Sequence, residues 1–191
     1  MFTGIIRSKG RIIFISPGKL KIEADFKVED GESVAVDGVC LTAVTQRRKV
    51  IEFDLLPQTW ERTALKYRKA GDEVNLELPS TPRTFLSGHI VQGHVDGVGK
   101  VERVIIKGTA LRVKFSAKDD VLKYLVPMGS VAVNGVSLTV SDLDRDGFYV
   151  ELIPETRKRT NLGNLKPGYF VNLEADIIGK YVLSFLERLR K

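Results

Sequence analysis

Short runs of apolar residues, separated by glycines and charged turns, make up most of the chain. Examples are Ser33–Val36, Val50–Leu55 and Leu111–Phe115. Runs of this kind recur at intervals of about 8–15 residues, a spacing typical of β-sandwiches and β-barrels. Asp37-Gly38 and Asn134-Gly135 stand between such runs. Each pair predicts a tight hairpin turn, because both central residues of that turn need positive φ.

Helical periodicity is clear only at the end of the chain. Ile178, Val182, Phe185 and Leu189 are spaced 4, 3 and 4 residues apart and form an apolar stripe on one face of a helix. The stripe would pack either on a barrel or against the same helix of neighbouring subunits, and the pattern leaves both open. Basic side chains favour the C-terminal end of this helix electrostatically: Arg188, Arg190 and Lys191.

The chain contains an internal sequence repeat of two copies. Ser33–Thr42 and Ser130–Thr139 are identical at eight of ten positions, at an offset of 97 residues, and the match continues without a gap to Glu77 and Glu174. An earlier segment repeats at a shorter offset, so that Gly4 corresponds to Gly93. Two copies indicate two similar domains rather than an array.

The boundary between the copies falls in a proline-bearing stretch, Pro79–Pro82. We therefore expect an all-β fold with an N-terminal domain at residues 1–87, a C-terminal domain at residues 88–177 and a helix at residues 178–191. A chain of 191 residues allows two domains of this size, each with a modest core.

Composition narrows the class of protein further. Hydrophobic residues make up 43% of the chain and charged residues 28%, as in an ordinary globular protein. We expect no signal peptide, and no apolar run approaches the roughly 20 residues needed to span a bilayer. The single cysteine, Cys40, fits a reducing cytoplasm. The net charge of +6 comes from scattered basic residues without a row of stacking aromatics, so no nucleic acid partner is expected.

Several motifs, in order and with consistent spacing, resemble the riboflavin synthase family along nearly the whole chain. They are Met1–Ile5, the two segments Gly38–Thr42 and Gly135–Thr139, Gly88–Gly97, Leu152–Thr156 and Val171–Glu174. Each motif alone is weak evidence, whereas the ordered set is specific. Gly38–Thr42 and Gly135–Thr139 resemble the two lumazine-binding repeats of the family.

The resemblance implies two six-stranded Greek-key β-barrels followed by a C-terminal α-helix through which family members form homotrimers. It implies that 6,7-dimethyl-8-ribityllumazine binds between the N-terminal barrel of one subunit and the C-terminal barrel of its neighbour. The expected reaction is a dismutation of two such molecules that needs no cofactor. Association with a lumazine synthase shell is a further expectation, and the sequence does not show which lumazine donates the four-carbon unit.

The resemblance also gives candidate catalytic residues. Cys40 in the first copy corresponds to Ser137 in the second, and this difference suits two pockets that play unlike roles. A small buried residue of a strand is the commoner role of a free cysteine, but the motif around Cys40 favours a contact with substrate. Asp176 could equally cap the final helix. His89 corresponds to a more structural position in the family, so it is not included among the candidate catalytic residues. The candidate set is Cys40, His94, Asn134, Ser137, Thr139 and Asp176.

Substrate contacts are expected from both copies, partly through the backbone of 54–59 and 153–158. Gly4, Ile5 and Ile6, with Gly93 and Val95, are expected to line the first pocket. The full set is Gly4, Ile5, Ile6, Ser33, Cys40, Leu41, Thr42, Asp54, Leu55, Leu56, Pro57, Gln58, Thr59, Gly93, His94, Val95, Met128, Ser137, Leu138, Thr139, Ile153, Pro154, Glu155, Thr156, Arg157 and Lys158.

Other interpretations compete with this one. The main alternative is a carrier of the same superfamily, which binds lumazine or flavin without converting it. Such relatives have lost catalytic side chains, whereas here all four of the following are present: Cys40, His94, Ser137 and Thr139. Met128 stands where the family usually has a lysine, which puts a contact at that position in doubt. A flavin reductase module of similar fold would lack the 97-residue repeat. The two histidines lie five residues apart in a glycine-rich segment, which does not fit a helical metal site, so no metal is expected.

Overall fold

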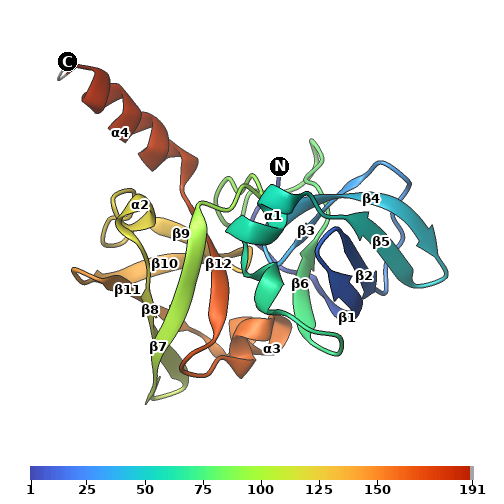
Figure 1. Ribbon diagram of the computed structural model, residues 1–191. Coiled ribbons are helices and arrows are strands. Elements are labelled where there is room, and N and C mark those ends of the chain that lie inside the picture. Colours follow the sequence, from blue (N-terminus) through green and yellow to red (C-terminus); the bar gives the residue numbers. More distant parts are fainter. Residues whose placement is uncertain (190–191) are drawn as a thin grey trace.

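The computed structural model describes residues 1–189, so Arg190 and Lys191, expected at the end of the helix, lie outside the described residues. Residues 1–189 form two closed antiparallel β-barrels of six strands each, with a C-terminal helix (Figure 1). The expected all-β architecture is therefore confirmed. Both barrels follow the same Greek-key path, as the repeat predicts.

The first barrel has the strand order β1-β2-β5-β4-β3-β6. Its strands are β1 (Ser8–Ser16), β2 (Lys19–Glu23), β3 (Ser33–Val36), β4 (Val39–Arg47), β5 (Val50–Asp54) and β6 (Glu73–Glu77). The second barrel closes in the equivalent cyclic order. Its strands are β7 (Gly97–Lys107), β8 (Ala110–Ser116), β9 (Ser130–Val133), β10 (Val136–Leu143), β11 (Gly147–Leu152) and β12 (Phe170–Ala175).

Side chains that alternate along the strands fill each barrel. In β8, Leu111, Val113 and Phe115 are buried while the residues between them are only partly buried, as expected for a strand with one face on a core. Phe115 packs on Phe148 with 5.4 Å between ring centroids. The two barrels have separate apolar cores, which is what two domains with their own cores require.

Short helices interrupt the β structure, two pairs of them at equivalent places of the repeat, and they are not apparent from periodicity. They are α1 (Pro57–Arg62) and η1 (Ala64–Tyr67), α3 (Pro154–Arg159) and η2 (Asn161–Asn164), and α2 (Asp119–Leu122). Six-residue helices are too short to show an apolar period. Their prolines stand in the first turn, where a missing N–H costs nothing.

The two predicted hairpin turns are confirmed and meet where the barrels join. Asp37 and Asn134 have φ of 45° and 46°, and the glycines after them have φ of 76°. A Cβ on Gly38 would lie 2.6 Å from the nitrogen of Gly135, so only glycine allows the two turns to approach this closely.

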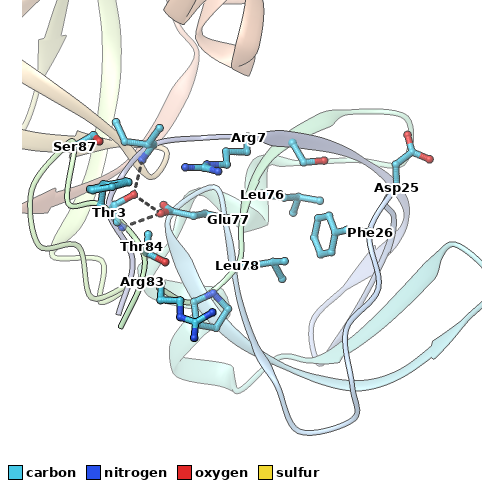
Figure 2. A pocket seen from close by; sticks show the side chains of 14 residues that line it. Thr3, Arg7, Asp25, Phe26, Leu76, Glu77, Leu78, Arg83, Thr84 and Ser87 are labelled. Carbon is cyan, nitrogen blue, oxygen red and sulfur yellow. Dashed lines mark hydrogen bonds between the residues drawn. The ribbon is translucent and has the colours of Figure 1, made fainter. Parts of the chain in front are cut away.

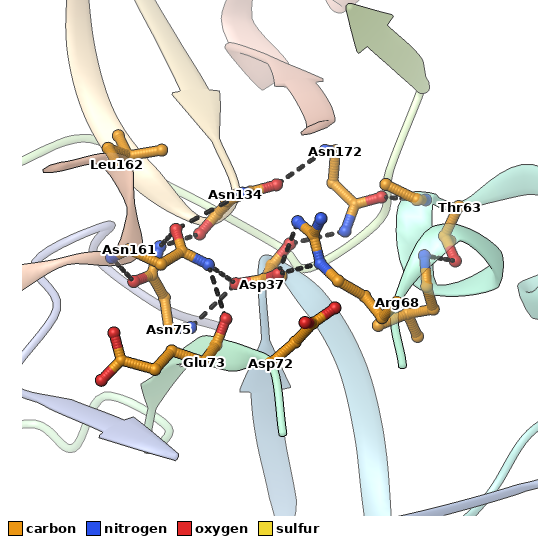
Figure 3. A network of polar contacts seen from close by, with 12 residues as sticks. Asp37, Thr63, Arg68, Asp72, Glu73, Asn75, Asn134, Asn161, Leu162 and Asn172 are labelled. Carbon is orange, nitrogen blue, oxygen red and sulfur yellow. Dashed lines mark hydrogen bonds and ion pairs between the residues drawn. The ribbon is translucent and has the colours of Figure 1, made fainter. Parts of the chain in front are cut away.

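A buried polar network surrounds these turns (Figure 3). The carboxylate of Asp37 accepts hydrogen bonds from the Arg68 guanidinium, the Asn75 backbone N–H and the Asn161 side chain. The Asn172 side chain donates to the Asp37 carbonyl at 2.8 Å. Because these partners come from both barrels, the network fixes how one barrel sits on the other.

The C-terminal helix α4 (Ile177–Leu189) extends away from both barrels (Figure 1). Its apolar stripe is exposed, with Phe185 at 63% and Leu189 at 67%. Of the two arrangements left open by the pattern, packing of the stripe on the chain's own barrels is therefore not observed. No helix in the described part of the chain combines the length and apolar character needed to span a membrane.

Candidate functional site

Two segments cross between the barrels, and we call residues 2–6 and 91–95 the crossover segments. Residues 2–6 precede β1 of the first barrel, yet the Gly4 carbonyl accepts a hydrogen bond from the Ser137 N–H in the second barrel at 2.8 Å. Residues 91–95 precede β7, yet the Gly93 carbonyl accepts from the Cys40 N–H in the first barrel at 2.9 Å. Each segment therefore serves the barrel to which it does not belong.

Packing of the apolar residues follows the same crossed pattern. Ile6 lies in the core of the second barrel, whereas Val95 packs against the core of the first. Phe2 and Val91 join the two segments by antiparallel backbone hydrogen bonds of 2.7 and 3.1 Å. The expectation that Gly4, Ile5 and Ile6 line the first pocket with Gly93 differs from this arrangement, which places Gly4 and Ile6 at the second barrel.

Glycine is required where each crossover segment touches the opposite barrel. A Cβ on Gly4 would lie 2.6 Å from Cβ of Ser137, and one on Gly93 would lie 2.5 Å from Cβ of Cys40. Both glycines also have positive φ, of 76° and 82°. The close approach and the backbone conformation thus exclude larger residues at two equivalent positions.

The site in the second barrel is built around Ser137 and His89. Nδ1 of His89 lies 2.7 Å from Oγ of Ser137. Burial lowers the pKa of His89, although the negative charge of Asp176 acts in the opposite direction. The imidazole is therefore neutral at neutral pH and able to accept a proton. His89 was expected to be structural, and the structure instead brings it to a candidate catalytic serine.

Asp176 links this site to the start of α4. Its carboxylate accepts a hydrogen bond from the Ile178 N–H at 3.0 Å, which is the capping contact expected for a helix N-terminus. Its charge also acts on His89. The two interpretations of Asp176 are compatible in this geometry, because one oxygen caps the helix while the charge faces the histidine.

The site in the first barrel contains Cys40, His94 and Thr42. Cys40 is half-buried on β4, opposite Ala35 on β3. His94 is exposed and follows Gly93 directly. Thr42 is exposed at the end of the same pairing, opposite Ser33, and Thr139 is exposed opposite Ser130 in the second barrel. The repeat thus gives two similar surfaces with unlike polar groups.

Several expected contact residues offer only their backbone. The side chains of Leu41 and Leu55 are buried in the core of the first barrel. Leu56 and Ile153, which are equivalent in the repeat, are exposed just before α1 and α3. Of the remaining residues of 54–59 and 153–158, Asp54 ends β5 and the others lie within α1 or α3.

Two other candidates behave differently from the rest. Asn134 is fully buried, and its side-chain oxygen accepts from the Asn172 N–H at 2.8 Å. Its expected catalytic role is therefore corrected to one in the inter-barrel network, since its side chain is enclosed away from a ligand. Met128 has φ of 65° and an exposed side chain.

Two cavities of the single chain each contain one candidate residue but not the central pair of either site. One of about 810 Å³ lies between the first barrel and the linker before β7 (Figure 2). Ile5, Phe26 and Phe85 are among its lining residues. Another of about 380 Å³ lies beside α4 and includes Asp176. Neither of these two cavities is lined by Cys40, His89 or Ser137. Cys40 and Ser137 are half-buried and His89 is buried, whereas Thr42 and Thr139, on the strands that carry Cys40 and Ser137, are exposed.

Comparisons with known proteins agree with the repeat. The family model described as a lumazine binding domain matches twice, at residues 3–79 and 92–176. The riboflavin synthase of Actinobacillus pleuropneumoniae is 40% identical over 195 residues, covering 97% of this chain and 90% of that protein. The riboflavin synthase of Bacillus subtilis is 36% identical over 195 residues, covering 98% of this chain and 91% of that protein.

Solved structures with the same fold include ligand complexes. LumP complexed with riboflavin superposes with a TM-score of 0.83 at 27% identity, covering 92% of this chain and 99% of that chain. LumP complexed with 6,7-dimethyl-8-(1'-D-ribityl) lumazine superposes with a TM-score of 0.80 at the same identity and coverage.

Proposed function

The chain belongs to the riboflavin synthase family of enzymes, built from two lumazine-binding domains, and from this premise we propose that it dismutates two molecules of 6,7-dimethyl-8-ribityllumazine. One molecule gives up a four-carbon unit and the other takes it up. The products are riboflavin and 5-amino-6-(D-ribitylamino)uracil. Together they contain all the atoms of the two substrates, so the reaction needs no cofactor or further reactant.

The observation that carries this proposal is a duplicated site with unlike groups at equivalent positions. The first barrel offers Cys40, and the second offers Ser137 with His89 at hydrogen-bond distance. Two identical substrates need two similar pockets, whereas donor and acceptor roles need different chemistry in each. Holding both molecules in place supplies about 7–11 kcal/mol relative to a bimolecular encounter.

His89 and Ser137 suit the proton transfer that the reaction requires. The 7-methyl group of the lumazine is acidic, and its proton must be removed before a carbon–carbon bond forms. In the proposed step, Oγ of Ser137 passes this proton to Nδ1 of the neutral His89 imidazole. Cys40, with His94 and Thr42, contacts the lumazine in the other pocket.

The proposal extends to the assembly. We place the reaction between the first barrel of one subunit and the second barrel of its neighbour in a homotrimer, located in the cytoplasm and able to associate with lumazine synthase. Support for the trimer comes from the exposed apolar stripe of α4 and from the exposed side chains of Thr42 and Thr139, on the strands that carry Cys40 and Ser137, which a second subunit would cover.

Blocking one pocket at a time tests whether two subunits share a site. Thr42 and Thr139 are equivalent and exposed, so Thr42→Trp and Thr139→Trp should each fill one pocket without disturbing a core. Each variant alone should lose nearly all riboflavin formation. Co-expressed subunits should recover about a quarter of the wild-type rate, because random mixing joins an open first barrel to an open second barrel at that fraction of interfaces.

The control is a mixture of the two purified variants without subunit exchange, which should stay inactive. Mass spectrometry of intact assemblies would establish that co-expressed subunits have mixed. Mixed assemblies that remain as inactive as either variant would contradict the shared site and would place both lumazines on one chain.

A carrier that binds the ligand without converting it is the second candidate, favoured by the similarity to LumP. Such a carrier requires a pocket but no proton transfer. The contact between His89 and Ser137 has no purpose in that function, and it is the geometry that favours the synthase.

A further inference from the structure

A buried glutamate of the first barrel holds the first crossover segment. Glu77, the last residue of β6, accepts hydrogen bonds from the N–H and hydroxyl of Thr3, both at 2.7 Å, and from the Gly4 N–H at 3.0 Å. Figure 2 shows Glu77 beside Thr3 with its hydrogen bonds to Thr3. Three donors on one buried carboxylate fix the backbone of residues 3–4 firmly.

The equivalent glutamate of the second barrel holds the second crossover segment. Glu174, on β12, accepts hydrogen bonds from the Gln92 N–H at 2.7 Å and the Gly93 N–H at 2.9 Å. Glu77 and Glu174 are 97 residues apart, the offset of the repeat. Their side chains are 9% and 3% exposed, so water does not compete strongly for these bonds.

Each carboxylate reaches the pocket of the opposite barrel through a single residue. Gly93 donates its N–H to Glu174 and accepts the Cys40 N–H with its carbonyl. Gly4 donates its N–H to Glu77 and accepts the Ser137 N–H with its carbonyl. The Thr3 carbonyl also accepts the His89 N–H at 3.2 Å, so Glu77 supports the backbone of both His89 and Ser137.

We propose that Glu77 and Glu174 are positioning residues that act crosswise: Glu174 of the second barrel sets the geometry around Cys40 in the first pocket, and Glu77 of the first barrel sets the geometry around Ser137 and His89 in the second. In each relay the carboxylate fixes the N–H of a glycine, and the carbonyl of the same glycine, in the next peptide group, orients the strand that carries the reacting side chain. The crossed geometry stands independently of the reaction, whereas its catalytic importance rests on the proposed function.

Cys40 is the only cysteine of the chain, so its rate of alkylation reports on the first pocket alone. We would measure alkylation by iodoacetamide at pH 8.5 in the substrate-free protein, comparing Glu174→Gln with its matched control Glu77→Gln. Burial raises the pKa of Glu174 to about 7, and at pH 8.5 its carboxylate is ionised in the wild type. A glutamine keeps one acceptor oxygen but turns an N–H donor toward a backbone N–H.

Glu174→Gln should change the alkylation rate of Cys40 by about threefold or more, the size of effect expected for coupling through a short contact chain. Glu77→Gln should leave that rate unchanged. An NMR titration that follows the ring signal of His89 reports on the second pocket in the same way. Glu77→Gln should shift the titration of His89, and Glu174→Gln should not.

The opposite pattern, with Glu77→Gln changing Cys40 and Glu174→Gln changing His89, would overturn the proposal. Equal changes of both reporters in both variants would also overturn it, since they would indicate general loosening. If a glutamine variant does not fold, Glu77→Asp and Glu174→Asp keep the charge but withdraw the carboxylate by one methylene, and the same crossed pattern is expected.

Riboflavin formation gives the catalytic reading. Both glutamine variants should lower kcat more than they raise KM, because they misplace a reacting group that still binds substrate. If the two reporters show the crossed pattern but the protein forms no riboflavin, the geometric relay stands and only the proposed reaction is contradicted. If the reporters show the crossed pattern but kcat is unchanged in both variants, Glu77 and Glu174 have no role in catalysis.

Discussion

Replacing His89 by asparagine should lower the turnover of lumazine to riboflavin by about 10²- to 10⁴-fold, the usual contribution of a positioned general base. The asparagine amide reaches roughly where Nδ1 lies and can keep the hydrogen bond to Ser137, but it cannot accept a proton at neutral pH. The dissociation constant for lumazine should change little. Stopped-flow absorbance gives turnover, and fluorescence titration gives binding.

The pH dependence should change with the same substitution. Burial lowers the pKa of His89, so in the wild type the base is lost only when the pH falls below the ordinary histidine value of about 6.5. Turnover should therefore decline on the acid side of that value. The asparagine variant should lack this decline, because no group remains there to be protonated.

Ser137→Ala supplies the matched comparison. If the two side chains act as one unit, the double variant Ser137→Ala/His89→Asn should be hardly slower than the slower single variant. Losses that multiply in the double variant would show that the two side chains act independently and would contradict the proton relay.

Replacing Arg68 by leucine should lower the free energy of unfolding by about 3–5 kcal/mol, the cost of leaving one member of a buried ion pair unpaired. Arg68 donates to Asp37 from Nε at 3.2 Å and from Nη2 at 3.0 Å. The two side chains are 2% and 0% exposed. Arg68 also stacks on the Tyr169 ring of the second barrel at 4.6 Å. Denaturant unfolding measures the change.

The chain contains its own control for this substitution. At the equivalent positions the second barrel has Asn134 and Leu165 instead of Asp37 and Arg68. The double variant Asp37→Asn/Arg68→Leu introduces the same uncharged pair into the first barrel. It should recover most of the stability lost by Arg68→Leu alone. A double variant as unstable as the single one would show that Arg68 acts through packing rather than through its charge.

The pattern of short strands predicts a sandwich or a barrel in each copy, and the resemblance to the family narrows this to two six-stranded Greek-key barrels. The hairpin turns at Asp37-Gly38 and Asn134-Gly135 follow from the need for positive φ, and the repeat makes each barrel evidence for the other. The short helices α1 and α3 could not be predicted in the same way, since six residues carry no apolar period. Their prolines, at equivalent positions of the repeat, were the available signal.

The crossed arrangement of the sites could not be read from the repeat. A repeat shows which residues are equivalent, but not which copy they pack against, and Gly4 and Ile6 were assigned to the wrong barrel for this reason. The contact of His89 with Ser137 could not be read from the repeat either. Under the pairing of Gly4 with Gly93, His94 corresponds to Ile5, and His89 falls before the first copy begins. A residue outside the repeat is a source of asymmetry, and two pockets with unlike roles require asymmetry.

The most direct test of the proposed reaction is to mix the purified protein with 6,7-dimethyl-8-ribityllumazine alone and to follow both compounds by visible absorbance. We expect one riboflavin to form for every two lumazines consumed, with no cofactor added. Binding of the lumazine, seen as a shift of its fluorescence, without any riboflavin would contradict the synthase and identify a carrier on the same fold.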